Sequence, residues 1–139
     1  MIRRLFTVLI LATLSGAYVA PAHAVFLEAE RLYSLGDTDG AIRAFEKRGS
    51  EGDGEALYTL GEIYARGVDV QLDLAAAYKW MCLASLKQVK FADRKVGILT
   101  GPLTHAQIRK ANDEAEEWLD DNPQGVPFKS CYNPGDKTD

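Results

Sequence analysis

The sequence predicts an all-α protein: an α-solenoid of about three antiparallel helix pairs with a closing C-terminal helix. Three observations favour this fold. Apolar residues recur at helical spacing in successive segments, short glycine-marked turns separate these segments, and the pattern of a helix pair occurs twice. The 139 residues are 47% hydrophobic and 26% charged, which is typical of a folded globular protein. No alternation of apolar and polar residues competes with helices.

The N-terminal segment has the layout of a secretory signal peptide. Residues 1–24 contain no acidic residue. Arg3 and Arg4 give the segment a positive start, and a ten-residue apolar run follows from Leu5 to Leu14. A small-residue pattern ends at Ala24, and we expect cleavage after it. The apolar run is too short for a stable transmembrane helix, which needs about 20 residues. An uncleaved anchor is the alternative.

The next part of the chain contains three segments with helical spacing of apolar residues. Turn residues 36–40 follow the first segment, and Gly49, Gly52 and Gly54 follow the second. The third helix is expected to stop at Gly67. The residues that define the three faces are Phe26, Ala29 and Tyr33; Ala41, Ala44, Phe45 and Arg48; and Leu57, Leu60, Gly61 and Tyr64.

Three further helices are predicted before the tail. Asp73 is a candidate N-cap of the fourth, and Thr104 with Gln107 forms a capping-box pattern at the start of the sixth. The fifth ends at Gly101. The expected buried faces are Ala77, Trp80, Leu83 and Ala84; Phe91, Ala92, Val96 and Leu99; and Ile108, Ala111, Ala115, Trp118 and Leu119.

These elements divide the chain into three parts. Residues 1–24 are the predicted signal peptide, residues 25–121 the helical domain, and residues 122–139 an irregular tail that contains prolines and glycines. Removal of residues 1–24 changes the formal net charge from −4 to −6. This acidic balance argues against a nucleic-acid partner, which requires a clustered basic surface.

The helices repeat as pairs. Gly36 and Gly67 end the first helix of two successive pairs, and each has a tyrosine three residues earlier. Asp37 and Asp73 begin the second helices. A repeating helix pair of this size is typical of an α-solenoid, in which each pair buries its apolar face on the next.

Residues 54–87 resemble one nearly complete Sel-one-like repeat, a branch of the tetratricopeptide-type helical repeats. Departures from the family pattern occur at Asp69, Ser85 and Gln88. The resemblance implies a helix-pair fold with a concave surface, in a family whose members generally act as adaptors. The residues that carry it are Leu60, Gly61, Tyr64, Gly67, Val70, Asp73, Ala77, Trp80 and Ala84.

The resemblance also implies candidate contact residues for a protein or peptide. In repeats of this type the first helix of each pair lines the concave surface, so Glu55, Tyr58, Glu62 and Arg66 should point into it. Tyr58 is expected to be an exposed aromatic, a residue type enriched at interaction hot spots. The alternative is a solvated helix face with ordinary ion pairs.

The two cysteines, Cys82 and Cys131, form a candidate disulfide. Their even number and the predicted export signal favour a bond, which would join the tail to the fourth helix. Cys82 is expected beside the main apolar face and not at its centre. The alternative is a buried Cys82 and an exposed thiol at Cys131.

No cofactor, metal ion or catalytic group is predicted. Asp37, Asp39 and Glu46 imitate part of a calcium-binding loop, but Leu35 occupies the first ligand position, so a turn explains them better. His105 is the one histidine of the mature chain. The nucleophile and phosphate-loop motifs of common enzyme classes do not occur.

The sequence therefore predicts a periplasmic or secreted adaptor that binds a protein or peptide and does not stay in a membrane. One alternative is a cell-wall-related enzyme of the penicillin-binding or β-lactamase type, which the resemblance brings in through cysteine-rich relatives. Those relatives carry a disulfide in each repeat, whereas this chain has two cysteines in all. The other alternative is a structural subunit of a larger assembly.

Overall fold

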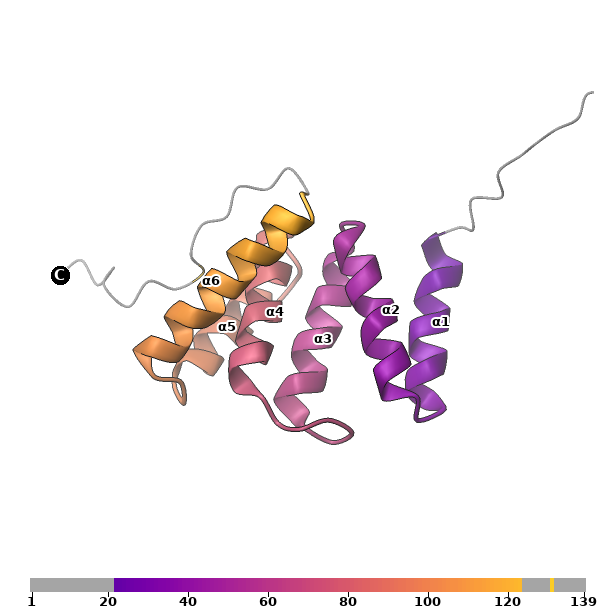
Figure 1. Cartoon of the computed structure of the whole chain (residues 1–139), viewed down its shortest axis with the longest axis horizontal. Helices are drawn as coiled ribbons and strands as arrows, with labels where there is room; N and C mark the ends of the chain where they lie inside the picture. Colours follow the sequence, from indigo (N-terminus) through magenta and orange to yellow (C-terminus); the bar gives the residue numbers. More distant parts are fainter. Residues whose placement is uncertain (1–21, 124–130, 132–139) are drawn as a thin grey trace, which may run out of the picture.

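The computed structural model describes residues 22–123 and residue 131, which form six helices and no strand (Figure 1). The prediction of an all-α protein is therefore confirmed. The helices are α1 (Ala22–Ser34), α2 (Thr38–Ser50), α3 (Gly54–Arg66), α4 (Leu74–Leu86), α5 (Ala92–Thr100) and α6 (His105–Asp121). No helix in this described part is both long and apolar enough to cross a membrane.

The proposed cleavage point after Ala24 falls within the first turn of α1. Residues 1–21, which hold most of the predicted signal peptide, lie outside the described residues, as does most of the tail after residue 123. The signal peptide and the irregular tail therefore remain predictions.

Local signals in the sequence set the helix ends. The Asp73 carboxylate accepts hydrogen bonds from the N–H groups of Ala75 and Ala76, at 3.0 and 2.9 Å, and so caps α4 as expected. Thr104 and Gln107 form both bonds of the predicted capping box at the start of α6. Gly67 ends α3 with φ 58°, a left-handed conformation that favours glycine.

The calcium-like residues at the start of α2 have a structural role. The Asp37 carboxylate accepts a hydrogen bond from the N–H of Gly40 at 2.9 Å and caps the helix. The turn interpretation of this segment therefore accounts for Asp37.

Successive helices run in alternate directions and mostly pack on their neighbours in the chain (Figure 1). Extensive contacts join α1 with α2, α2 with α3, α3 with α4, and α4 with α5. The closing helix differs, because α6 packs extensively on α4. Helix α4 thus contacts three other helices and lies at the centre of the packing.

The core consists of two clusters that meet at α4. Trp80, Leu83 and Ala84 of α4 belong to a first cluster with residues of α1, α2, α3 and α6, together with Ala92. Four other residues of α4 belong to a second cluster: Ala77, Tyr78, Met81 and Cys82. The other members of this cluster are Val96, Leu99, Leu103, Ile108 and Ala111. A helix that is apolar on all sides must be covered on all sides, which explains why three helices surround α4.

Most described residues of the predicted helix faces are buried, but Tyr33, Ala44, Tyr64 and Trp118 are only partly buried and Phe91 is exposed. Phe91 is not on the buried face of α5: it precedes the helix and is 56% exposed, so this expectation was wrong. Tyr64 and Trp118 are half-buried and pack at the edge of the first cluster. Periodicity assigns a side chain to one face of its helix, but the position and length of the neighbouring helices decide whether that side chain is buried.

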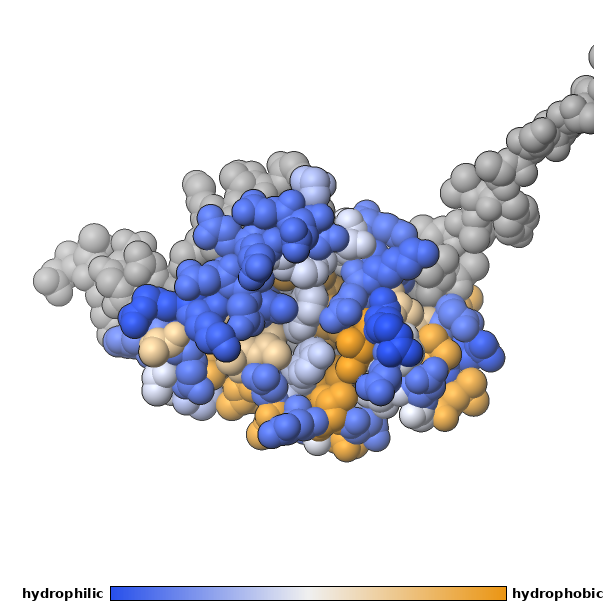
Figure 2. All heavy atoms as spheres, in the orientation of Figure 1, coloured by the Kyte–Doolittle hydropathy of each residue, from blue (hydrophilic) through white to orange (hydrophobic). Residues whose placement is uncertain are grey.

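Ionic and polar contacts join elements that the apolar core brings together. Arg48, buried near the end of α2, pairs with Asp53, whose carboxylate also caps α3. Figure 2 shows hydrophilic side chains over α6 and hydrophobic ones gathered over the lower parts of α2 and α3.

Replacement of Trp80 tests the position of the core. The side chain is 3% exposed, and its ring meets that of Trp118 edge to face at 5.6 Å between centroids. Trp80→Ala should lower the free energy of unfolding by about 3–5 kcal/mol, as measured by urea unfolding. Trp118→Ala removes the same ring contact from a half-buried position and should cost less. Equal losses from the two variants would contradict this packing.

A pair of glycines tests the closeness of α3 to α4. A Cβ at Gly61 would lie 2.7 Å from Cγ of Met81, a side chain that is only 1% exposed. Gly61→Ala should therefore destabilise the protein by about 1–3 kcal/mol. Gly97 on α5 has open space around it, so Gly97→Ala should stabilise by about 0.5–1 kcal/mol through helix propensity. A gain from both variants in thermal unfolding would show that Met81 moves aside freely.

Candidate functional site

Two adjoining pockets lie along α1, α3 and α5, and Tyr58 of α3 lines both. The first, the α1–α3 pocket, has a volume of about 200 Å³ and is lined by Tyr33, Tyr58, Thr59, Glu62, Ile63 and Arg66. The second, the α3–α5 pocket, has a volume of about 280 Å³ and is lined by Tyr58, Phe91, Arg94, Lys95 and Ile98. Together they form what we call the Tyr58 surface.

Three of the four predicted contact residues line this surface. Tyr58, Glu62 and Arg66 are on the wall of the α1–α3 pocket, while Glu55 is exposed but lines neither pocket. Tyr58 differs from expectation in its burial. It is half-buried and packs against both core clusters, because α4 and α5 approach the side of α3 from which it projects.

An ion pair connects the helices that form the two pockets. Glu62 of α3 lies 2.7 Å from the ammonium group of Lys95 on α5 and 3.4 Å from the guanidinium group of Arg66. The Glu62 side chain is only 20% exposed, so the Lys95 contact is partly screened from solvent. The Glu62 carboxylate is thus paired with cations of the Tyr58 surface itself, and its contact with Lys95 links α5 to α3.

Tyr33 contributes a neutral hydroxyl group to the α1–α3 pocket. Burial, followed by the negative charge of Asp69, raises the pKa of Tyr33 above its ordinary value of 10. The phenol is uncharged at neutral pH, and its hydroxyl group already hydrogen-bonds to the Asp69 side chain.

The sequence alone missed the contribution of α5. Phe91, Arg94, Lys95 and Ile98 line a pocket because α5 packs on α4 beside α3, which periodicity does not specify. A signal was present, since three lysines and one arginine occur between residues 87 and 95 of an acidic chain. A local excess of one charge is a pointer to an interaction surface.

The backbone at Phe91 is unusual. Its φ is 71°, in the left-handed region that a bulky non-glycine residue rarely adopts. A strained backbone that holds an aromatic ring in solvent is more common at functional sites than elsewhere.

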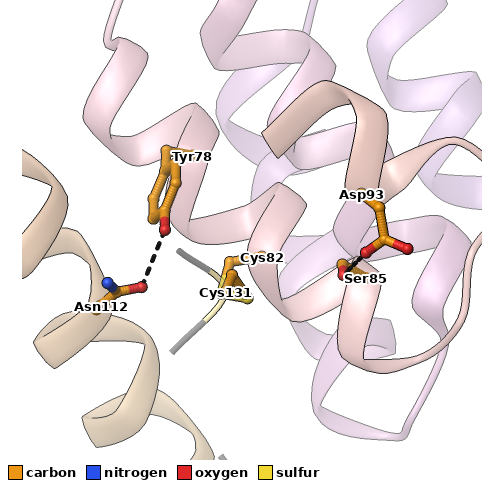
Figure 3. Close-up of a disulfide and its surroundings, with 6 residues drawn as sticks. All are labelled: Tyr78, Cys82, Ser85, Asp93, Asn112 and Cys131. Carbon is orange, nitrogen blue, oxygen red and sulfur yellow. Dashed lines mark hydrogen bonds between the residues drawn. A yellow bond between two sulfur atoms is a disulfide. The ribbon is translucent and has the colours of Figure 1, made fainter. Parts of the chain in front are cut away.

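The second predicted pair, Cys82 and Cys131, forms a disulfide with a Cα–Cα distance of 5.6 Å (Figure 3). The prediction of this bond is confirmed. Cys82 is completely buried in the second cluster, beside the predicted face residues Trp80, Leu83 and Ala84, which belong to the first cluster. Cys131 packs against the same cluster. Nearby, the Tyr78 hydroxyl donates to the Asn112 side-chain oxygen at 3.2 Å (Figure 3).

Comparisons of the chain with protein-family models, with curated proteins and with solved structures find no match. The similarity to Sel-one-like repeats therefore depends only on the matching positions within residues 54–87.

Loss of the disulfide should reduce stability without loss of the fold. The bond closes a loop of 49 residues, and the chain-entropy account gives about 3–4 kcal/mol for a loop of this length. Cys131→Ser should lower the free energy of unfolding by about this amount. A reductant should destabilise the parent protein to the same level and leave Cys131→Ser unchanged. Equal stability of the oxidised parent and the variant would contradict a stabilising role.

Proposed function

We propose that this protein is an exported helical-repeat adaptor that binds an extended segment of another protein through the Tyr58 surface. The single observation that carries this proposal is the pair of adjoining pockets along α1, α3 and α5. Extended segments bind well to elongated surfaces where successive side chains enter successive pockets.

The interpretation of the fold as a solenoid supports this choice of surface. In it, α1 with α2, α3 with α4, and α5 with α6 count as three helix pairs in chain order, although extensive contacts join only the first two pairs, and α5 and α6 each pack on α4. The first helix of each pair then contributes to one surface, as in Sel-one-like repeats. The described pockets are lined by residues of these three helices and by Phe91, which directly precedes α5.

Export is supported by two independent features. Residues 1–24 have the pattern of a signal peptide, and Cys82 and Cys131 are bonded, which is typical of proteins in an oxidising compartment. We therefore propose the periplasm or the cell exterior as the site of action.

Selection from a random displayed-peptide library tests the proposed function. Peptides selected on the oxidised protein should compete with one another and should shift the amide NMR signals of α1, α3 and α5. Thr59→Arg places a large side chain in the α1–α3 pocket and should weaken binding at least about tenfold, since a hot-spot contact contributes about 2 kcal/mol or more.

Thr100→Arg is the matched control. Both threonines donate their hydroxyl to a backbone carbonyl of their own helix, but Thr100 lines neither pocket. Equal binding by the two variants, or selected peptides that shift only signals of α2 and α6, would contradict the proposal.

A further inference from the structure

The α3–α5 pocket combines exposed apolar side chains with positive charge. Phe91 and Ile98 are 56% and 61% exposed, although both are large hydrophobic residues, and Tyr58 completes the apolar wall. Arg94 and Lys95 supply the charged part. A solvent-exposed apolar surface next to a cationic group is suited to a ligand that has both an apolar and an anionic part.

The charges of this pocket are not all compensated by residues that the structure describes. Glu62 neutralises Lys95 at 2.7 Å. Arg94 forms no ion pair with any residue in the described part of the chain. The one acidic residue of α5, Asp93, accepts a hydrogen bond from Ser85 at the end of α4 (Figure 3). Within residues 22–123, therefore, the guanidinium group of Arg94 at the pocket has no compensating carboxylate.

The conformation of Phe91 adds an independent argument. Asparagine or glycine would adopt its left-handed backbone at lower cost, and its ring is mostly exposed, so neither backbone geometry nor core packing explains phenylalanine here. A ring held at the pocket despite this strain has a clear use if it contacts a ligand.

Building on the proposed function, we propose that the α3–α5 pocket recognises a peptide segment in which an apolar side chain lies next to a carboxylate. The apolar side chain packs between Tyr58, Phe91 and Ile98, and the carboxylate pairs with Arg94. A guanidinium group presents parallel N–H donors that match the two oxygens of a carboxylate, which makes the contact specific as well as attractive.

Charge and size favour a peptide over an anionic membrane. The exported chain has a formal net charge of −6, so an extended, negatively charged bilayer would repel the protein as a whole. A pocket of about 280 Å³ is at the lower limit of small-molecule sites and suits one or two side chains.

Three pools of fluorescent synthetic peptides test the proposal. Each peptide contains leucine followed by aspartate in the first pool, by asparagine in the second and by lysine in the third, with the flanking positions randomised. Anisotropy titrations at low salt should show the aspartate pool binding roughly tenfold more tightly than the asparagine pool, as for a charge-assisted hydrogen bond, and the lysine pool most weakly. The preference should decrease as salt is added.

Three variants assign this preference to the pocket. Arg94→Gln should abolish the difference in affinity between the aspartate and asparagine pools. Arg109→Gln, the same change at an exposed position of α6, should preserve this difference. Phe91→Asn suits the left-handed backbone and should keep the melting temperature or raise it, yet weaken all three pools. An unchanged affinity of Phe91→Asn for the pools would overturn the role of the ring.

The outcomes separate this proposal from the proposed function. If library-selected peptides bind the Tyr58 surface but the three pools bind equally, the adaptor function stands and the acidic-peptide specificity is overturned. If no peptide binds that surface, both are overturned. Arg94-dependent binding to phosphatidylglycerol vesicles, with no preference among the pools, would also overturn the proposal in favour of a lipid surface.

Discussion

The structure depends on the burial of one helix, α4, between three others. Seven of its thirteen residues are buried, and they are divided between the two core clusters. Because α4 has no polar face, α3, α5 and α6 must each contribute an apolar face to cover it. The disulfide adds Cys131 to this cover, beside the second cluster. In a short chain with little core to spare, such a covalent link is a substantial part of the total stability.

The candidate binding surface is a consequence of this burial. Since α3 and α5 both pack on α4, they lie close enough to one another for Glu62 and Lys95 to pair. Tyr58 lies between the resulting pockets and also packs against both clusters. A ligand on this surface would therefore contact a side chain that is held by the core, and a rigid aromatic residue loses little conformational entropy on binding.

Charge is distributed unevenly between the two pockets. In the α1–α3 pocket, Glu62 and Arg66 partly compensate one another, and the Tyr33 phenol, whose pKa burial raises further above its ordinary value, adds no charge. In the α3–α5 pocket, Arg94 has no acidic partner among the described residues. This asymmetry gives a bound segment a preferred direction, because its anionic part belongs near α5.

The sequence by itself determined the helices, most of their ends and the one pairing that two cysteines allow. These features depend on local chemistry: Asp73 and Thr104 cap the helices that follow them, Gly67 adopts a left-handed conformation, and two cysteines admit one intramolecular bond. Only the tertiary structure decided the environment of Tyr58, Phe91 and Arg94. Helical spacing assigns each residue to a side of its own helix, but burial, strain and charge compensation arise from neighbours distant in the sequence. Here the covering of α4 brings those neighbours together.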